Sequence, residues 1–171
     1  SKGGGAVRNT VYQTHQISKN GIGLLVSGTA ANVTLDNVTI EGNYAIQMQN
    51  SGTAVISNGA INGLAVGISV LGNGAANPAT SLTINQGTAV TAGIYGISGN
   101  GQEKYGGTVI SITGGTIRQT IEDGGAIYHP QDGTLNISGA PVIEGANGIQ
   151  LCSGEGVIAN ITGGTIRATG S

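Results

Sequence analysis

The amino-acid sequence predicts an all-β chain wound as a single parallel β-solenoid, with three strands per turn and about six full coils of 22 to 30 residues. Three observations lead to this prediction. Short apolar-x-apolar units recur along the chain, and the first units of successive coils are separated by 22, 22, 29, 30 and 22 residues. The segment ITGGTIR occurs twice, at residues 112–118 and 161–167. The composition is rich in Gly and poor in aromatic and charged residues.

The composition indicates how the core is built and which partners to exclude. The 171 residues include 33 Gly but no Phe and no Trp, and 8% are charged. Such a core has to consist of stacked Ile, Val and Leu on short strands. Disorder fits poorly, because β-branched residues recur throughout and the net charge is only −2. This charge gives no basis for binding nucleic acid, and no apolar run approaches the roughly 18 residues of a membrane span.

Each expected coil contains three units in which apolar residues alternate with small polar ones. The first units are residues 24–26, 46–48, 68–70, 97–98, 127–129 and 149–151. The second units are residues 33–35, 54–56, 82–84, 110–112, 135–137 and 159–161. The third units end at Ile40, Ile61, Val90, Ile117, Ile143 and Ile166. A period of two indicates strands, and their regular recurrence indicates a solenoid in which each coil buries its inner face against its neighbours.

Gly and Asn between the units are expected to form the corners, because both residues tolerate positive φ. The two copies of ITGGTIR are then the second strand, the Gly-Gly corner and the third strand of coils four and six. A series of hairpins would not place residues about 22 positions apart in register. The solenoid does, and it predicts one continuous internal row. That row contains Ile56, Ile84, Ile112, Ile137 and Ile161.

These repeats resemble the right-handed parallel β-helix (pectate-lyase-like) superfamily, which includes pectate lyases, phage tailspikes and bacterial surface adhesins with GTLNISG- and ITGGTI-like repeats. GTLNISG stands at residues 133–139, and the resemblance covers about residues 19–170. It implies a right-handed solenoid. It says little about activity, because this fold carries many functions. Scarcity of Cys and Lys is typical of extracellular bacterial and phage β-proteins, so we expect an extracellular, cell-surface or virion-surface location.

The two ends of the chain are expected to differ. Residues 1–18 are interpreted as a partial coil or N-terminal cap, and residues 19–171 as the β-helix domain. No capping segment follows the last coil, and an open solenoid end exposes unpaired backbone. We therefore expect the solenoid to continue beyond residue 171 or to stack end to end on another subunit, as in a homo-oligomer.

Two longer coils point to a candidate site, because insertions in solenoids form loops that often line a binding face. The insertions are residues 71–81 and 98–107, and three of the five tyrosines and six of the 14 charged residues lie between Tyr95 and Asp132. Tyrosine rings and carboxylates suit sugar rings, although charged loop residues are often only solvated. The candidate ligand-binding residues are Tyr95, Glu103, Tyr105, Glu122, Asp123, Tyr128, His129 and Asp132.

Other polar residues receive structural interpretations. Arg118, Glu144 and Arg167 follow the third strands of successive coils and are expected to form a charge ladder along the axis. His129 occupies a phase filled elsewhere by aliphatic residues, and we expect its ring to bond a loop carbonyl. Cys152 is expected to be a small packed residue. As the only cysteine it excludes an internal disulfide and a cysteine metal cluster, and no metal or cofactor is expected.

Three functions remain open at this stage. The first is a non-enzymatic recognition or adhesion module that contacts glycans or a cell-surface receptor. The second is a polysaccharide lyase or glycoside hydrolase with its site near residues 95–132. Such an enzyme needs converging carboxylates, or a base with calcium ligands, and only Glu122 or Asp123 together with Asp132 could approach this arrangement. The third is a structural spacer or filament subunit without a ligand.

Overall fold

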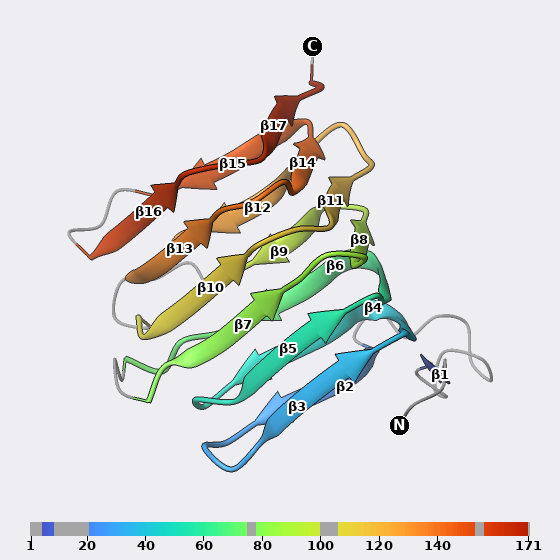
Figure 1. The fold of residues 1–171 in the computed structure, drawn as a ribbon, viewed down its shortest axis with the longest axis vertical. Helices are drawn as coiled ribbons and strands as arrows, with labels where there is room; N and C mark the ends of the chain where they lie inside the picture. Colours follow the sequence, from blue (N-terminus) through green and yellow to red (C-terminus); the bar gives the residue numbers. More distant parts are fainter. Residues whose placement is uncertain (1–4, 9–20, 75–77, 100–105, 153–155, 171) are drawn as a thin grey trace.

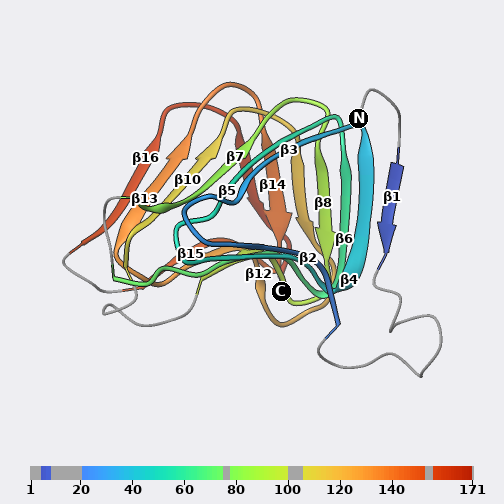
Figure 2. The same ribbon diagram turned by 90° about the horizontal axis from the view of Figure 1, so that it is seen from below.

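The computed structural model describes residues 5–8, 21–74, 78–99, 106–152 and 156–170. These residues form strands, turns and bends and no helix, so none of them belongs to a helix able to cross a membrane. The strands stack into a parallel solenoid of about six turns, which confirms the predicted fold class. Figure 1 shows the coils stacked along the long axis, and Figure 2, from below, shows their three sides.

The second strands form a separate six-stranded parallel sheet, ordered β16-β13-β10-β7-β5-β3. It lies at the front of Figure 1. The strands are β3 (Asn32–Asp36), β5 (Thr53–Ser57), β7 (Thr80–Ile84), β10 (Thr108–Ile112), β13 (Gly133–Ile137) and β16 (Val157–Ile161). The inward positions are largely apolar, and the outward positions are mostly polar, with Val55, Val109 and Ile158 among them.

The first and third strands belong to one larger sheet of 11 strands. The separate first strands are β2 (Ile22–Ser27), β9 (Tyr95–Ser98), β12 (Gly125–His129) and β15 (Asn147–Leu151). The separate third strands are β1 (Gly5–Arg8), β8 (Ala89–Ala92), β11 (Thr116–Gln119), β14 (Val142–Gly145) and β17 (Thr165–Ala168). Two long strands, β4 (Val38–Gln49) and β6 (Ala60–Val70), serve as the third strand of one coil and the first strand of the next.

The long strands β4 and β6 differ from the predicted three separate strands per turn. Parallel pairing continues around the corner between them, and the register shifts between Gly42 and Tyr44. Such an irregularity lets a strand bend without losing its partner. In the later coils the third and first strands are separate. Thr120–Gly124 stand between β11 and β12, whereas only Ala146 stands between β14 and β15.

The predicted internal row exists and runs the length of the second sheet. Leu35, Ile56, Ile84, Ile112, Ile137 and Ile161 pair in unbroken register on successive strands. Ile56, Ile84 and Ile112 are fully buried, whereas Ile161 in the last described coil is 47% exposed. Each central side chain packs between an aliphatic neighbour above and one below. These stacked aliphatic side chains form the core of a chain that has no Phe and no Trp.

The corner between the second and third strands explains the repeated Gly and Asn. One residue in each coil has positive φ at this corner, and only Gly and Asn occupy it. These residues are Asn37, Asn58, Gly87, Gly115, Gly139 and Gly164. Polar side chains beside the corner bond between coils, as in the Asn85 amide to Ser57 Oγ and the Thr113 hydroxyl to Asn85 Oδ1, both at 3.1 Å. The two ITGGTIR segments are therefore alike because both build this corner.

Candidate functional site

A groove lies on the outer face of the first strands, over β4, β6, β9 and β12. We call it the tyrosine groove, and its volume is about 360 Å³. Its lining residues are Tyr44, Gln47, Val66, Ser69, Leu71, Tyr95, Ser98, Gly99 and Tyr128. Because neighbouring strands pair in register, these residues fall into rows along the solenoid axis. Gln47 aligns with Ser69, Ser69 with Ser98, and Ser98 with Tyr128.

Two predicted residues, Tyr95 and Tyr128, stack on one another in this groove. Their ring centroids are 5.2 Å apart and the planes differ by 21°. Tyr95 pairs in register with Gly125, and Tyr128 lies three residues further along β12. The stacked pair forms an aromatic surface of two rings that is partly open to solvent. Such a surface suits a ligand with a flat apolar face.

The Tyr128 hydroxyl and the Cys152 sulfur are hydrogen-bonded at 3.5 Å. This bond is the largest cause that raises the pKa of Tyr128 to about 12, and burial is the next. Tyr128 therefore keeps its proton at neutral pH. The expectation that Cys152 is packed is wrong: it is a free, exposed thiol. The reason is that β15 has no further described coil above it, so its end is left open.

His129 lies inside the solenoid, not on the groove. Its side chain is fully buried, and neither ring nitrogen has a hydrogen-bond partner in the described part of the chain. The predicted bond to a loop carbonyl is not seen as a direct hydrogen bond among the described residues, although the backbone of Gly133 interacts with the ring. Burial lowers the pKa of His129, and the neighbouring backbone of Gly133 opposes this with a smaller effect. His129 pairs with Leu151 on β15, in a row where Met48 and Val70 also point inward.

Gln131 occupies the space that Gly99 leaves in the same row. A Cβ atom at Gly99 would collide with the Gln131 amide. The amide nitrogen donates to Val70 O at 3.2 Å and to Thr108 Oγ1 at 3.3 Å, and the side chain is fully buried. Next to it, Asp132 packs against Gly156. Asp132 Oδ1 is buried and has no partner among the described residues.

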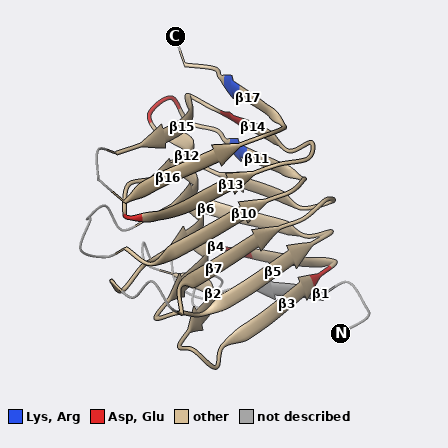
Figure 3. Ribbon diagram, turned by 60° about the vertical axis from the view of Figure 1, so that its left-hand side comes forward, with Lys and Arg blue, Asp and Glu red and all other residues tan. Residues whose placement is uncertain are grey.

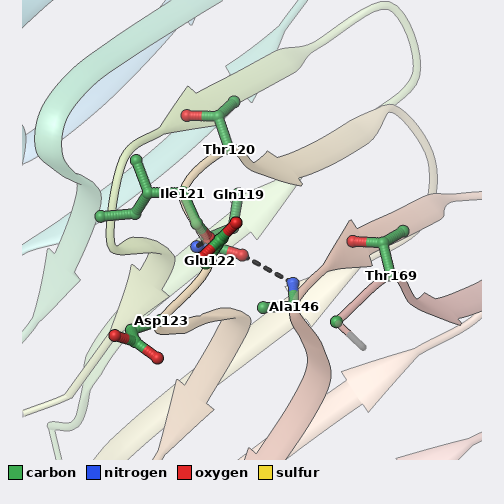
Figure 4. Close-up of a pocket in the computed structure, with 8 residues that line it drawn as sticks. Gln119, Thr120, Ile121, Glu122, Asp123, Ala146 and Thr169 are labelled. Atoms are coloured by element: carbon green, nitrogen blue, oxygen red, sulfur yellow. Dashed lines mark hydrogen bonds between the residues drawn. The ribbon is translucent and has the colours of Figure 1, made fainter.

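Glu122 and Asp123 lie at the opposite end of β12, in a separate depression of about 390 Å³ (Figure 4). Both carboxylates are exposed. Beside them the buried Gln119 ties the corner together: its Oε1 accepts the Ala146 amide at 2.7 Å, and its Nε2 bonds Gly93 O and Ile121 O. This buried amide stabilises the corner from which the two acids project.

The structure therefore separates the candidate residues. Tyr95 and Tyr128 meet in the groove, His129 is internal, and Glu122 and Asp123 precede β12 whereas Asp132 follows it. The five residues of β12 that separate them correspond to roughly 16 Å of extended strand, so these acids do not converge on one bond. Glu103 and Tyr105 lie outside the described residues. Within the described ranges no three His, Cys, Asp or Glu side chains are grouped to hold a metal ion.

Charged residues near the ends of the third strands alternate in sign across β11, β14 and β17 (Figure 3). The Arg118 guanidinium lies 3.2 Å from Glu144 Oε1, and that of Arg167 lies 3.8 Å from Glu144 Oε2. Both arginine side chains are more than half exposed. The three residues thus form a ladder along the axis, on a different face from the tyrosine groove.

Sequence reasoning missed Tyr44, Gln47 and Ser69 as groove residues. The signal was present, because Tyr44 aligns with Val66 and Val66 with Tyr95 through two coil intervals. Following outward positions along the axis would have grouped them with Tyr95. The comparisons with known proteins add no relative: no protein-family model, no curated protein and no solved structure matches the chain.

Proposed function

We propose that the chain is a non-enzymatic recognition module that binds glycans through the tyrosine groove. The stacked pair of Tyr95 and Tyr128 carries this proposal. Aromatic faces pack against the C–H face of a sugar ring, while hydroxyl and amide groups bond its hydroxyls. The groove offers both, since Gln47, Ser69 and Ser98 lie beside the tyrosines.

The hydroxyl of Tyr128 is protonated at neutral pH, as in an ordinary tyrosine, and its raised pKa of about 12 extends this to alkaline pH. The ring therefore stacks as a neutral phenol. The resemblance of the repeats to surface adhesins and phage tailspikes of the pectate-lyase-like superfamily fits a location outside a cell or on a virion. We propose this location together with the function.

A glycan array with the purified chain tests the proposal. Wild-type protein should bind at least one glycan class, and Tyr95→Ala and Tyr128→Ala should each lose most of that binding. Thr116→Ala, on the exposed third-strand face, serves as the matched control and should bind like wild type. Circular dichroism establishes that all variants fold.

Three results would reject the proposal. No binding to any glycan would favour the spacer or filament role. Binding that survives both tyrosine variants would place the site elsewhere. Turnover on a polysaccharide panel would favour the lyase or hydrolase, and loss of that turnover on Asp123→Asn or Asp132→Asn would identify its acids.

A further inference from the structure

The tyrosine groove consists of two parallel rows that run along the solenoid axis. One row is polar and contains Gln47, Ser69 and Ser98, one residue on each of β4, β6 and β9. The other row starts three residues earlier on the same strands and contains Tyr44, Val66 and Tyr95. The groove is thus apolar along one side and hydrogen-bonding along the other, and both properties repeat with each coil.

Two serine hydroxyls of the polar row can form hydrogen bonds with a ligand at the bottom of the groove. Ser69 and Ser98 are only 4% and 6% exposed, although their side chains line the groove. Neither hydroxyl has a hydrogen-bond partner among the described residues. Neither Oγ atom is buried from water, so both hydroxyls are accessible to a ligand hydroxyl that can bond them.

The described lining of the groove carries no charged side chain. The arginines described with their side chains, Arg118 and Arg167, lie on the third-strand face and are engaged by Glu144. A carboxylated sugar entering the groove would give up part of its hydration without meeting a cation there. A neutral sugar would not incur this cost.

The spacing of the rows fits a repeating ligand. Neighbouring strands of a sheet lie about 4.8 Å apart, which is close to the length that one pyranose ring adds to an extended glycan. On β4, β6 and β9 each ring then meets one polar and one apolar position, and on β12 the next ring meets Tyr128. From β4 to β12 the groove crosses four strands, enough for a chain of about four rings.

We infer that the ligand of the tyrosine groove is a neutral, extended polysaccharide chain lying along the solenoid axis, with about four sugar rings in contact. This inference rests on the proposed glycan-binding function and specifies its ligand class. The C–H faces pack against Tyr44, Val66 and Tyr95, and the hydroxyls bond Ser69 and Ser98. The stacked ring of Tyr128 closes the β12 end.

Isothermal titration calorimetry of the full chain tests the inference with two kinds of probe. Neutral probes are β-1,4-linked oligomers of glucose, mannose and N-acetylglucosamine, with two to six rings. Charged probes are galacturonate oligomers of the same lengths. We expect at least one neutral series to bind, with affinity rising about tenfold or more from two rings to four and then levelling off. Galacturonates of equal length should bind at least about tenfold more weakly.

Serine variants assign the contact to the groove floor. Ser69→Ala and Ser98→Ala should each weaken binding of the four-ring oligomer several-fold. Ser111→Ala, which removes the same hydroxyl from the outer face of β10, should leave it unchanged. Removal of one small hydroxyl leaves the inner core intact, so circular dichroism spectra of all three should match wild type.

The outcomes separate this inference from the proposed function. Galacturonates that bind as tightly as neutral oligomers would overturn neutrality while leaving glycan binding in place. Affinity independent of length beyond one ring would overturn the axial arrangement. Equal binding by the Ser98→Ala and wild-type chains would remove the polar row from the contact. Failure of every oligosaccharide, neutral or charged, would overturn both this inference and the proposed function.

Discussion

Replacing Ile112 by Ala tests whether stacking along the internal row stabilises the solenoid. Ile112 is fully buried and lies in register between Ile84 and Ile137. The substitution removes three carbon atoms, or roughly 2.4 kcal/mol of transfer free energy at about 0.8 kcal/mol each. Neighbouring coils are held apart by the sheet and cannot collapse into the space, so a cavity term raises the expected loss to about 3–4 kcal/mol.

Ile161→Ala is the matched control, since it makes the same change in the same row. Ile161 is 47% exposed and pairs on one side with Ile137. About half of the transfer free energy is therefore already absent, and no closed cavity forms, so the expected loss is about 1 kcal/mol. Urea unfolding followed by far-UV circular dichroism measures both values. A loss for Ile161→Ala equal to or greater than that for Ile112→Ala would refute the stacking argument.

Three further predictions concern titration and surface charge. Burial lowers the pKa of His129 below its unfolded value of 6.5, so the free energy of unfolding should fall as the pH drops below about 6.5. His129→Leu should remove this part of the pH dependence. Urea midpoints at pH 7 and pH 5 measure the effect. Tyr128 should ionise near pH 12 in an ultraviolet titration, and Cys152→Ala should lower that pKa because the thiol contact is the largest cause of the shift. Glu144→Gln should cost at most about 1 kcal/mol, and less in 1 M salt, since its partner Arg118 is largely exposed; a loss unaffected by salt would contradict an electrostatic role.

The coil architecture could be predicted because the rows repeat in the sequence. Ile56, Ile84 and Ile112 recur in the same phase, and burial in a stacked solenoid follows from that phase alone. The Gly or Asn at the corner was equally visible, because positive φ restricts the choice of residue. The fusion of third and first strands in β4 and β6 was not, because it depends on whether pairing continues around a short corner.

Only part of the candidate site could be predicted from the sequence. Tyr95 and Tyr128 were found because aromatic residues are rare here, but their stacking across β9 and β12 depends on side-chain packing between coils. Sequence proximity grouped Asp123 with Asp132, although an extended strand holds them apart. Gln131 gave no signal at all. Its role depends on Gly99, one coil away, and patterns within a single coil do not show such a contact.

The contact between Gln131 and Gly99 has a consequence for redesign of the chain. In a repeat protein, single turns are natural units to delete or exchange. Here, however, coil five supplies the side chain that completes the interior of coil four and anchors it to Val70 of coil three. Cutting between coils four and five would therefore damage both pieces, and a shortened variant should keep these three turns together.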